Sequence, residues 1–151
     1  AGIVGVVLSL VFMAGSAFGV YAIAHSTAAD PGCISYERAG EGLYSQATAD
    51  SQRINAAKAS GSSADMSSAE SAYLQDLETA AADLAYAETL AQHANVRAAL
   101  QKGATDAEDL VHAFTQYLAE NNNAAEVESS AQAMVADGTS IDGLCQNATN
   151  G

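Results

Sequence analysis

Two cysteines and three histidines are the residues of this 151-residue chain with the widest chemical range. Cys33 and Cys145 lie near the two ends of its polar part, and neither belongs to a CxxC or CxxCH motif. That spacing is not typical of a zinc finger or of haem attachment. In an oxidising compartment such a pair forms one disulfide. Because each cysteine flanks a helical segment, we predict a Cys33–Cys145 bridge, with two buried, unpaired thiols as the alternative.

The three histidines do not form a recognisable metal site. His25 follows the apolar opening segment, whereas His93 and His112 are expected on different helices, outside any HExxH or ExxH pattern. The chain has no GxSxG, P-loop or GxGxxG motif. Its carboxylates are scattered, as expected for solvated helix faces rather than for a catalytic pair. We therefore predict no catalytic residue, no metal ligand and no cofactor, and the chain is not expected to be an enzyme.

The opening segment, residues 1–25, contains no Asp, Glu, Lys or Arg. As a helix, residues 2–24 would extend about 35 Å, enough to cross a hydrocarbon core of about 30 Å. The segment therefore predicts a transmembrane anchor. A cleaved signal peptide is the alternative, because Ala22-Ile23-Ala24 resembles a cleavage site. Its apolar stretch is, however, longer than a usual signal-peptide core.

Two glycines of the predicted anchor favour helix packing within the membrane. Gly15 and Gly19 form a small-xxx-small pair, which permits close approach of another helix. Residues 26–32 are expected to be a juxtamembrane linker in which Asp30-Pro31-Gly32 ends the anchor helix. The cysteine pair and the acidic remainder favour an extracytoplasmic position for the rest of the chain.

Residues 33–145 read as a helical bundle, followed by a polar tail at 146–151 that contains the glycosylation pattern Asn147-Ala148-Thr149. A narrow apolar stripe predicts a first helix over 34–60, and Gly61-Ser62-Ser63 predicts a turn. A near-heptad seam predicts one long helix over 65–102. The members of the two stripes are Tyr36, Leu43, Ala47, Ile54 and Ala57, then Met66, Tyr73, Leu77, Ala81, Leu84, Ala87 or Ala91, and Ala94.

Capping signals divide the remainder of the bundle. Lys102-Gly103 is typical of a helix end, and Thr105 followed by Glu108 fits a capping box. A third helix through Leu110 and Phe114 is expected to end at the asparagines 121–123, and a last one to end at Asp137-Gly138. The fold class is thus all-α: one transmembrane helix, then an antiparallel bundle of three to four helices closed by one disulfide.

Charge limits the partners of this chain. Its 18 Asp and Glu residues against 5 Lys and Arg give a net charge of −13. Such a surface repels phosphate backbones, so nucleic acid is not an expected partner, whereas a positively charged mobile partner would be attracted. With no catalytic motif, the sequence predicts a non-catalytic accessory subunit whose anchor packs on integral membrane protein subunits.

Two known kinds of protein share this outline. A single anchor before an Ala-rich acidic bundle is similar in architecture and composition to the small single-pass accessory subunits of actinobacterial respiratory supercomplexes. That resemblance implies a structural role in the cell membrane, with the bundle on the outer face. A chain that opens directly on an apolar helix also looks like a processed pilin, which would make it a filament subunit. It departs from the pilin pattern at Gly5, where type IV pilins usually carry Glu. A third interpretation is an envelope binding protein with a ligand groove between its helices.

Overall fold

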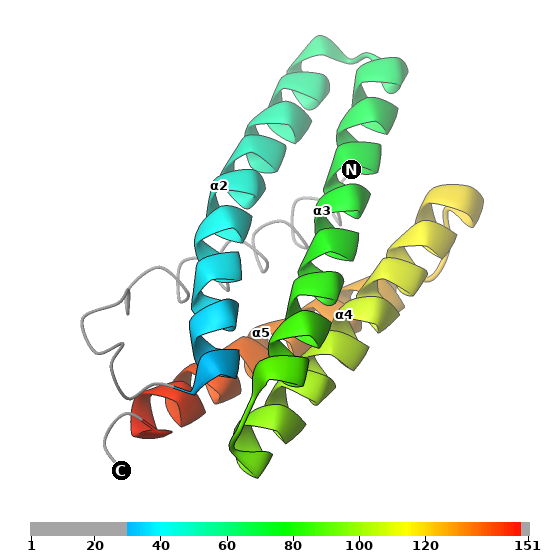
Figure 1. Cartoon of the computed structure of the whole chain (residues 1–151). Helices are drawn as coiled ribbons and strands as arrows, with labels where there is room; N and C mark the ends of the chain where they lie inside the picture. Colours follow the sequence, from blue (N-terminus) through cyan, green and yellow to red (C-terminus); the bar gives the residue numbers. More distant parts are fainter. Residues whose placement is uncertain (1–29, 149–151) are drawn as a thin grey trace.

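The computed structural model describes residues 30–148, which form four α-helices (Figure 1). The helices are α2 (Pro31–Ser60), α3 (Ser63–Leu90), α4 (Ala94–Glu120) and α5 (Ala124–Ala148). Each helix packs along the next in the chain, in antiparallel order. The predicted all-α bundle of three to four helices with one disulfide is confirmed for this part of the chain, with four helices.

Two apolar clusters hold the helices together. The distal core lies toward the α2–α3 turn, and the basal core lies at the opposite end, around the disulfide. The distal core consists of Ile54, Ala57, Ala69, Tyr73, Leu77, Leu110, Ala113, Phe114, Val127 and Ala131. The basal core consists of Cys33, Tyr36, Ala87, Ala91, Val96, Leu100, Ile141 and Cys145. About half of the buried positions in α2 and α3 belong to the predicted stripes, because helical periodicity places them on one face.

Two of the predicted turns are confirmed. Gly61 ends α2 in the left-handed region, with φ +67°, and the Ser62 side chain caps α3 by accepting a hydrogen bond from Asp65 N. At the other turn, Asn121 and Asn123 have φ values of 53° and 55°. Asparagine tolerates this conformation better than most non-glycine residues, which explains the chain reversal there.

The predicted long helix over 65–102 is wrong, because the chain breaks at residues 91–93. Ala91 is extended, with ψ 128°, and His93 is the N-cap of α4 without a side-chain cap of its own. The freed N–H groups of Gln92 and His93 both donate to the Asp30 carboxylate, more than 60 residues earlier in the chain. A contact of this range leaves no local signal in the sequence.

The helix end predicted at Lys102-Gly103 is also wrong, as is the capping box at Thr105, because all three residues lie inside α4. A Cβ on Gly103 would be only 3.2 Å from Ile141 Cδ1, so this glycine permits close approach of α4 and α5. The Thr105 hydroxyl donates to the Gln101 carbonyl in the preceding turn. Gly103 therefore serves packing between helices, and Thr105 makes a hydrogen bond within a continuous helix.

The bundle extends further than predicted at both of its ends. α2 begins at Pro31 rather than Ile34, with Asp30 as its N-cap. Proline is favoured in the first turn of a helix because no partner is needed for its missing N–H. At the other end, α5 continues through Asp137-Gly138 to Ala148. Asp30-Pro31-Gly32 thus starts α2, while the anchor helix that it was predicted to end lies outside the described residues.

None of the helices in the described range 30–148 is long and apolar enough to cross a membrane. The predicted anchor, residues 1–25, lies outside the described residues, and so do Gly15, Gly19 and His25.

Candidate functional site

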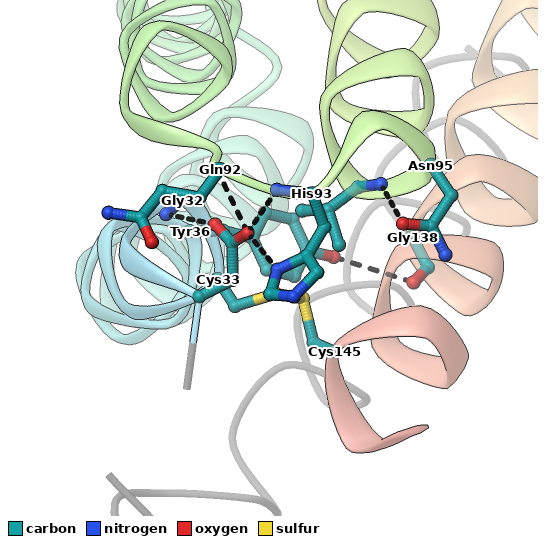
Figure 2. Close-up of a disulfide and its surroundings, with 10 residues drawn as sticks. Gly32, Cys33, Tyr36, Gln92, His93, Asn95, Gly138 and Cys145 are labelled. Atoms are coloured by element: carbon teal, nitrogen blue, oxygen red, sulfur yellow. Dashed lines mark hydrogen bonds and ion pairs between the residues drawn. A yellow bond between two sulfur atoms is a disulfide. The ribbon is translucent and has the colours of Figure 1, made fainter. Parts of the chain in front are cut away.

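The predicted disulfide joins the first turn of α2 to the last turns of α5. Cys33 and Cys145 are bonded, with an S–S distance of 2.05 Å and a Cα–Cα distance of 5.6 Å. Figure 2 shows the bridge beside Gly32, Gln92 and His93, so three segments far apart in sequence meet here. The bridge therefore confirms the predicted pairing and closes the basal end of the bundle.

The same end contains a buried carboxylate with several hydrogen-bond donors. Asp30 is 1% exposed, and its Oδ1 accepts from Gly32 N at 2.8 Å. Its Oδ2 accepts from Gln92 N at 2.9 Å and from His93 N at 2.7 Å. His93 Nδ1 lies 2.6 Å from the same oxygen, which places the ring proton on Nδ1 because an ionised carboxylate only accepts. We call Asp30, Gly32, Gln92 and His93 the Asp30 cluster.

The charge of Asp30 is stabilised where it lies. Burial alone would raise the pKa of Asp30, but hydrogen bonds from His93, Gly32 and Gln92 outweigh it and hold the pKa below 3.8. One carboxylate thus caps α2 and fixes the break between α3 and α4. All its described partners are donors that hold the helix ends in place. The Asp30 cluster therefore accounts for the packing at this end of the bundle and does not itself suggest a reaction.

The other predicted histidine, His112, lies on α4 away from the Asp30 cluster. Its Nε2 is 3.0 Å from Gln116 Nε2 at an exposed position, one helical turn apart. The structure therefore does not bring His93 and His112 together. Within residues 30–148, no group of three or more His, Cys, Asp or Glu side chains is arranged to hold a metal ion.

A groove runs between α2 and α5, with α3 forming its floor. The two outer helices meet at the basal end, where the Tyr36 hydroxyl donates to the Gly138 carbonyl at 3.5 Å (Figure 2). Further along, a cavity of about 60 Å³ lies between α2, α3 and α5. We call this feature the α2/α5 groove. Its apolar walls include Leu43, Ala47, Leu77, Met134 and Val135.

Two residues that line this groove, Asp50 and Tyr73, each have one buried oxygen atom that receives no hydrogen bond from an N–H group in the described part of the chain. Asp50 is 1% exposed; its Oδ1 accepts from Arg53 Nη1 at 3.0 Å, while its Oδ2 receives no hydrogen bond from an N–H or hydroxyl group. Tyr73 is 2% exposed, and its hydroxyl is unpaired as well. Unpaired buried polar groups are costly and uncommon, so these two require an explanation.

A second carboxylate lies beside Asp50 in the groove. Burial, together with the hydrogen bond and charge of Asp76, raises the pKa of Asp50 to about 7, against the opposing effect of Arg53. The two carboxyl groups can form that hydrogen bond only when one of them keeps a proton, because ionised carboxylates are acceptors only. Burial and then the charge of Asp50 also raise the pKa of Tyr73. The groove therefore holds negative charge in an apolar setting.

Other carboxylates are also less solvated than the sequence suggested. Asp137 is buried and bound to Lys102 Nζ at 2.6 Å, and Lys102 also binds Asp106 at 2.6 Å. Near the basal end, burial raises the pKa of Asp142 to about 6, although a hydrogen bond with Tyr36 opposes this. The expectation that the acids follow solvated faces is thus wrong for Asp30, Asp50 and Asp137. Asp30 and Asp137 are buried against hydrogen-bond donors that lie far away in the sequence. Asp50 is buried where α3 and α5 pack beside α2.

Comparison of the chain with protein-family models, with curated proteins and with solved structures finds no match.

Proposed function

We propose that the protein is a non-catalytic, single-pass accessory subunit of a membrane protein complex. In this proposal residues 1–25 are the anchor, and the helical bundle lies on the extracytoplasmic face against integral membrane protein subunits. A bacterial respiratory complex is the partner implied by the resemblance in outline. The glycine pair Gly15 and Gly19 would provide the packing surface of the anchor.

One observation supports this proposal most strongly: the bundle is fixed at the point where the apolar segment joins it. Only residues 26–29 separate that segment from Asp30 in the sequence. Asp30 is buried and accepts hydrogen bonds from Gly32, Gln92 and His93, and the disulfide at Cys33 lies three residues further on. An anchor attached there would hold the bundle in a defined orientation, which is what a structural subunit requires.

The disulfide and the acidic composition support the proposed location. Disulfides persist in oxidising compartments, which favours the outer side of a cell membrane. A net charge of −13 would also attract a positively charged mobile partner to that face.

The test is purification of the tagged full chain from native membranes under mild detergent, with identification of what accompanies it. A stoichiometric set of integral membrane proteins is expected. A homopolymer would instead support the filament-subunit alternative, and an isolated monomer would contradict both.

A variant pair tests the packing surface of the anchor. Gly15→Leu with Gly19→Leu should reduce recovery of the complex at least about tenfold, since bulky side chains prevent close helix approach. Ala17→Leu is the matched control, because position 17 lies about 200° around a helix from position 15. Equal recovery of both variants would reject this face as the contact surface.

A further inference from the structure

We propose that the basal end of the bundle rests on the lipid headgroups of the membrane, with the side chains of Tyr86 and Leu90 at the interface. We call these two residues the basal rim. This inference rests on the proposed function, because it requires residues 1–25 to be the anchor. It adds a contact between the bundle and lipid, and a chain that is anchored without this contact would contradict the inference alone.

The basal rim is large apolar surface that the fold leaves exposed. Within residues 30–148 the exposed large apolar side chains are Tyr44, Tyr86 and Leu90, at 41%, 61% and 37%. Tyr86 and Leu90 are four residues apart on α3, so they lie on one face of the helix. Neither belongs to the basal core or the distal core. Tyrosine is enriched at membrane interfaces, because its ring is apolar and its hydroxyl can bind water or headgroups.

The described chain begins next to the basal rim. Gln92 N and His93 N donate to the Asp30 carboxylate at 2.9 Å and 2.7 Å, and a Cβ on Gly32 would lie only 2.8 Å from Ala91 Cβ. Figure 1 shows the end of α3 and the beginning of α2 at the same end of the bundle. Residues 1–29 therefore join the bundle where α3 presents Leu90.

The reach of the connecting residues limits the height of the basal rim above the membrane. Residue 25, the end of the proposed anchor, is separated from Asp30 by a stretch that extends at most about 18 Å. The headgroup layer is itself about 5–8 Å thick on each side of the hydrocarbon core. The basal end of the bundle therefore lies within this layer or close above it.

The distribution of charge favours the same orientation. The charged residues of the basal end, taken as 30–40, 86–99 and 138–148, are Asp30, Glu37, Arg38, Glu88, Arg97 and Asp142. All other Asp and Glu residues of the chain lie at 41–85 and 100–137, where the bases are only Arg53, Lys58 and Lys102. Most of the net charge of −13 is therefore carried away from the basal end, which lowers the repulsion between the bundle and anionic headgroups.

The chain contains no tryptophan, which allows a direct test. Tyr86→Trp in the full chain places a single tryptophan at the basal rim. Tyr44→Trp is the matched control, because Tyr44 is an exposed tyrosine of α2 about 20 Å along the helix from Pro31. Both variants are reconstituted in phosphatidylcholine nanodiscs, with and without bromine on the acyl chains close to the headgroups. Bromine should reduce the emission of Tyr86→Trp at least about twofold and that of Tyr44→Trp less than about 1.2-fold, since only the first tryptophan reaches the interface.

The outcomes separate the lipid contact from the anchor. A chain that enters the nanodiscs without quenching of Tyr86→Trp would overturn the lipid contact and leave the anchor in place. A chain that stays outside the nanodiscs would contradict the anchor and this inference with it. Equal quenching of both variants would overturn the proposed orientation. Emission of Tyr86→Trp that moves to shorter wavelength in the native complex, without quenching in nanodiscs, would assign the basal rim to a partner subunit and overturn the proposal.

A charge placed on the basal rim tests the contribution of Leu90. Leu90→Glu, added to Tyr86→Trp, should lower the bromine effect at least about twofold, because a carboxylate disfavours contact with acyl chains. Thr79→Glu is the matched control, since it adds the same charge at an exposed position of α3 about 16 Å along the helix from Leu90. Circular dichroism checks that both variants keep the fold. Equal effects of the two substitutions would assign the loss to net charge and contradict the placement of Leu90 at the interface.

Discussion

Asp30 and Asp50 are equally buried, yet their surroundings are opposite. Each is 1% exposed and lies on or next to α2. Asp30 accepts hydrogen bonds from three backbone N–H groups and one imidazole, so its charge is stabilised. Asp50 has one arginine on Oδ1 and shares a hydrogen bond with a second carboxyl group, Asp76, while no N–H group in the described chain donates to its Oδ2.

The difference appears in the two pKa values. The pKa of Asp30 lies below 3.8 because its hydrogen bonds outweigh the cost of burial. Burial and Asp76 raise the pKa of Asp50 to about 7. Hydrogen-bond donors convert a buried carboxylate into a structural element, whereas a lack of them leaves it destabilised in the folded protein.

The disulfide should give the largest change in stability at the basal end. Replacing both cysteines, Cys33→Ala with Cys145→Ala, is expected to lower the free energy of unfolding by up to about 4.7 kcal/mol, the chain-entropy value for a loop of about 100 residues. Urea unfolding of the full chain, followed by circular dichroism, measures the loss. Reduced wild-type protein is the control and should show a similar loss. A change below about 1 kcal/mol would mean that the bridge does little to restrict the unfolded chain.

Asp30→Ala should have the next largest effect. It removes the N-cap of α2 and leaves the N–H groups of Gly32, Gln92 and His93 without their acceptor, so we expect a loss of about 3 kcal/mol. Asp30→Asn keeps one acceptor and should lose less. Because the folded pKa is below 3.8, the contribution of Asp30 is complete above about pH 4 and disappears as the pH falls further. A loss equal to that of an exposed Asp109→Asn change would contradict the structural role of Asp30.

The Asp30 cluster also shows where the sequence is insufficient. Helical periodicity continues through Ala87, Ala91 and Ala94, so nothing local marks the break at residues 91–93. The break is stable because Asp30, a residue assigned to a linker, receives the freed N–H groups from across the bundle. In the same way, Gly103 has the pattern of a helix end although it allows packing against Ile141.

What the sequence did predict depended on repeated or local signals. Apolar periodicity identified the helical class, and turn residues placed the reversals at Gly61 and Asn121. Two cysteines flanking the helical region allowed a single bridge, which the structure contains. The groove had no such signal, because Asp50, Tyr73 and Met134 come from three helices whose relative placement is a property of the whole bundle.

Asp50→Asn should change stability in the direction opposite to Asp30→Ala. A carboxyl group whose pKa is raised on folding binds more protons in the folded state, so stability falls as the pH rises from about 4 to about 7. The asparagine variant cannot ionise and should therefore gain about 1–2 kcal/mol relative to wild type above pH 7, with no gain near pH 4. Subtracting the stability–pH profile of the variant from that of wild type separates the contribution of Asp50 from that of Asp142. A wild-type protein that is more stable than the variant at pH 8 would contradict the contrast between the two aspartates.

The smallest effect compares two glycines of α2, one at the basal end and one beside open solvent. A Cβ on Gly32 would lie 2.8 Å from Ala91 Cβ and 2.9 Å from the Ala87 carbonyl oxygen, whereas a Cβ on Gly42 would meet nothing within 4 Å. Gly32→Ala should cost about 1–2 kcal/mol, because the backbone of α3 must move to accept the methyl group. Gly42→Ala should instead stabilise the protein by about 0.5–1 kcal/mol, since alanine restricts the unfolded chain and favours a helix. Urea unfolding of both variants measures the two changes in the free energy of unfolding, which should have opposite signs. If Gly32→Ala were as stable as Gly42→Ala, α2 and α3 would not be in close contact beside Asp30, and the fixed attachment point on which the proposed function depends would be lost.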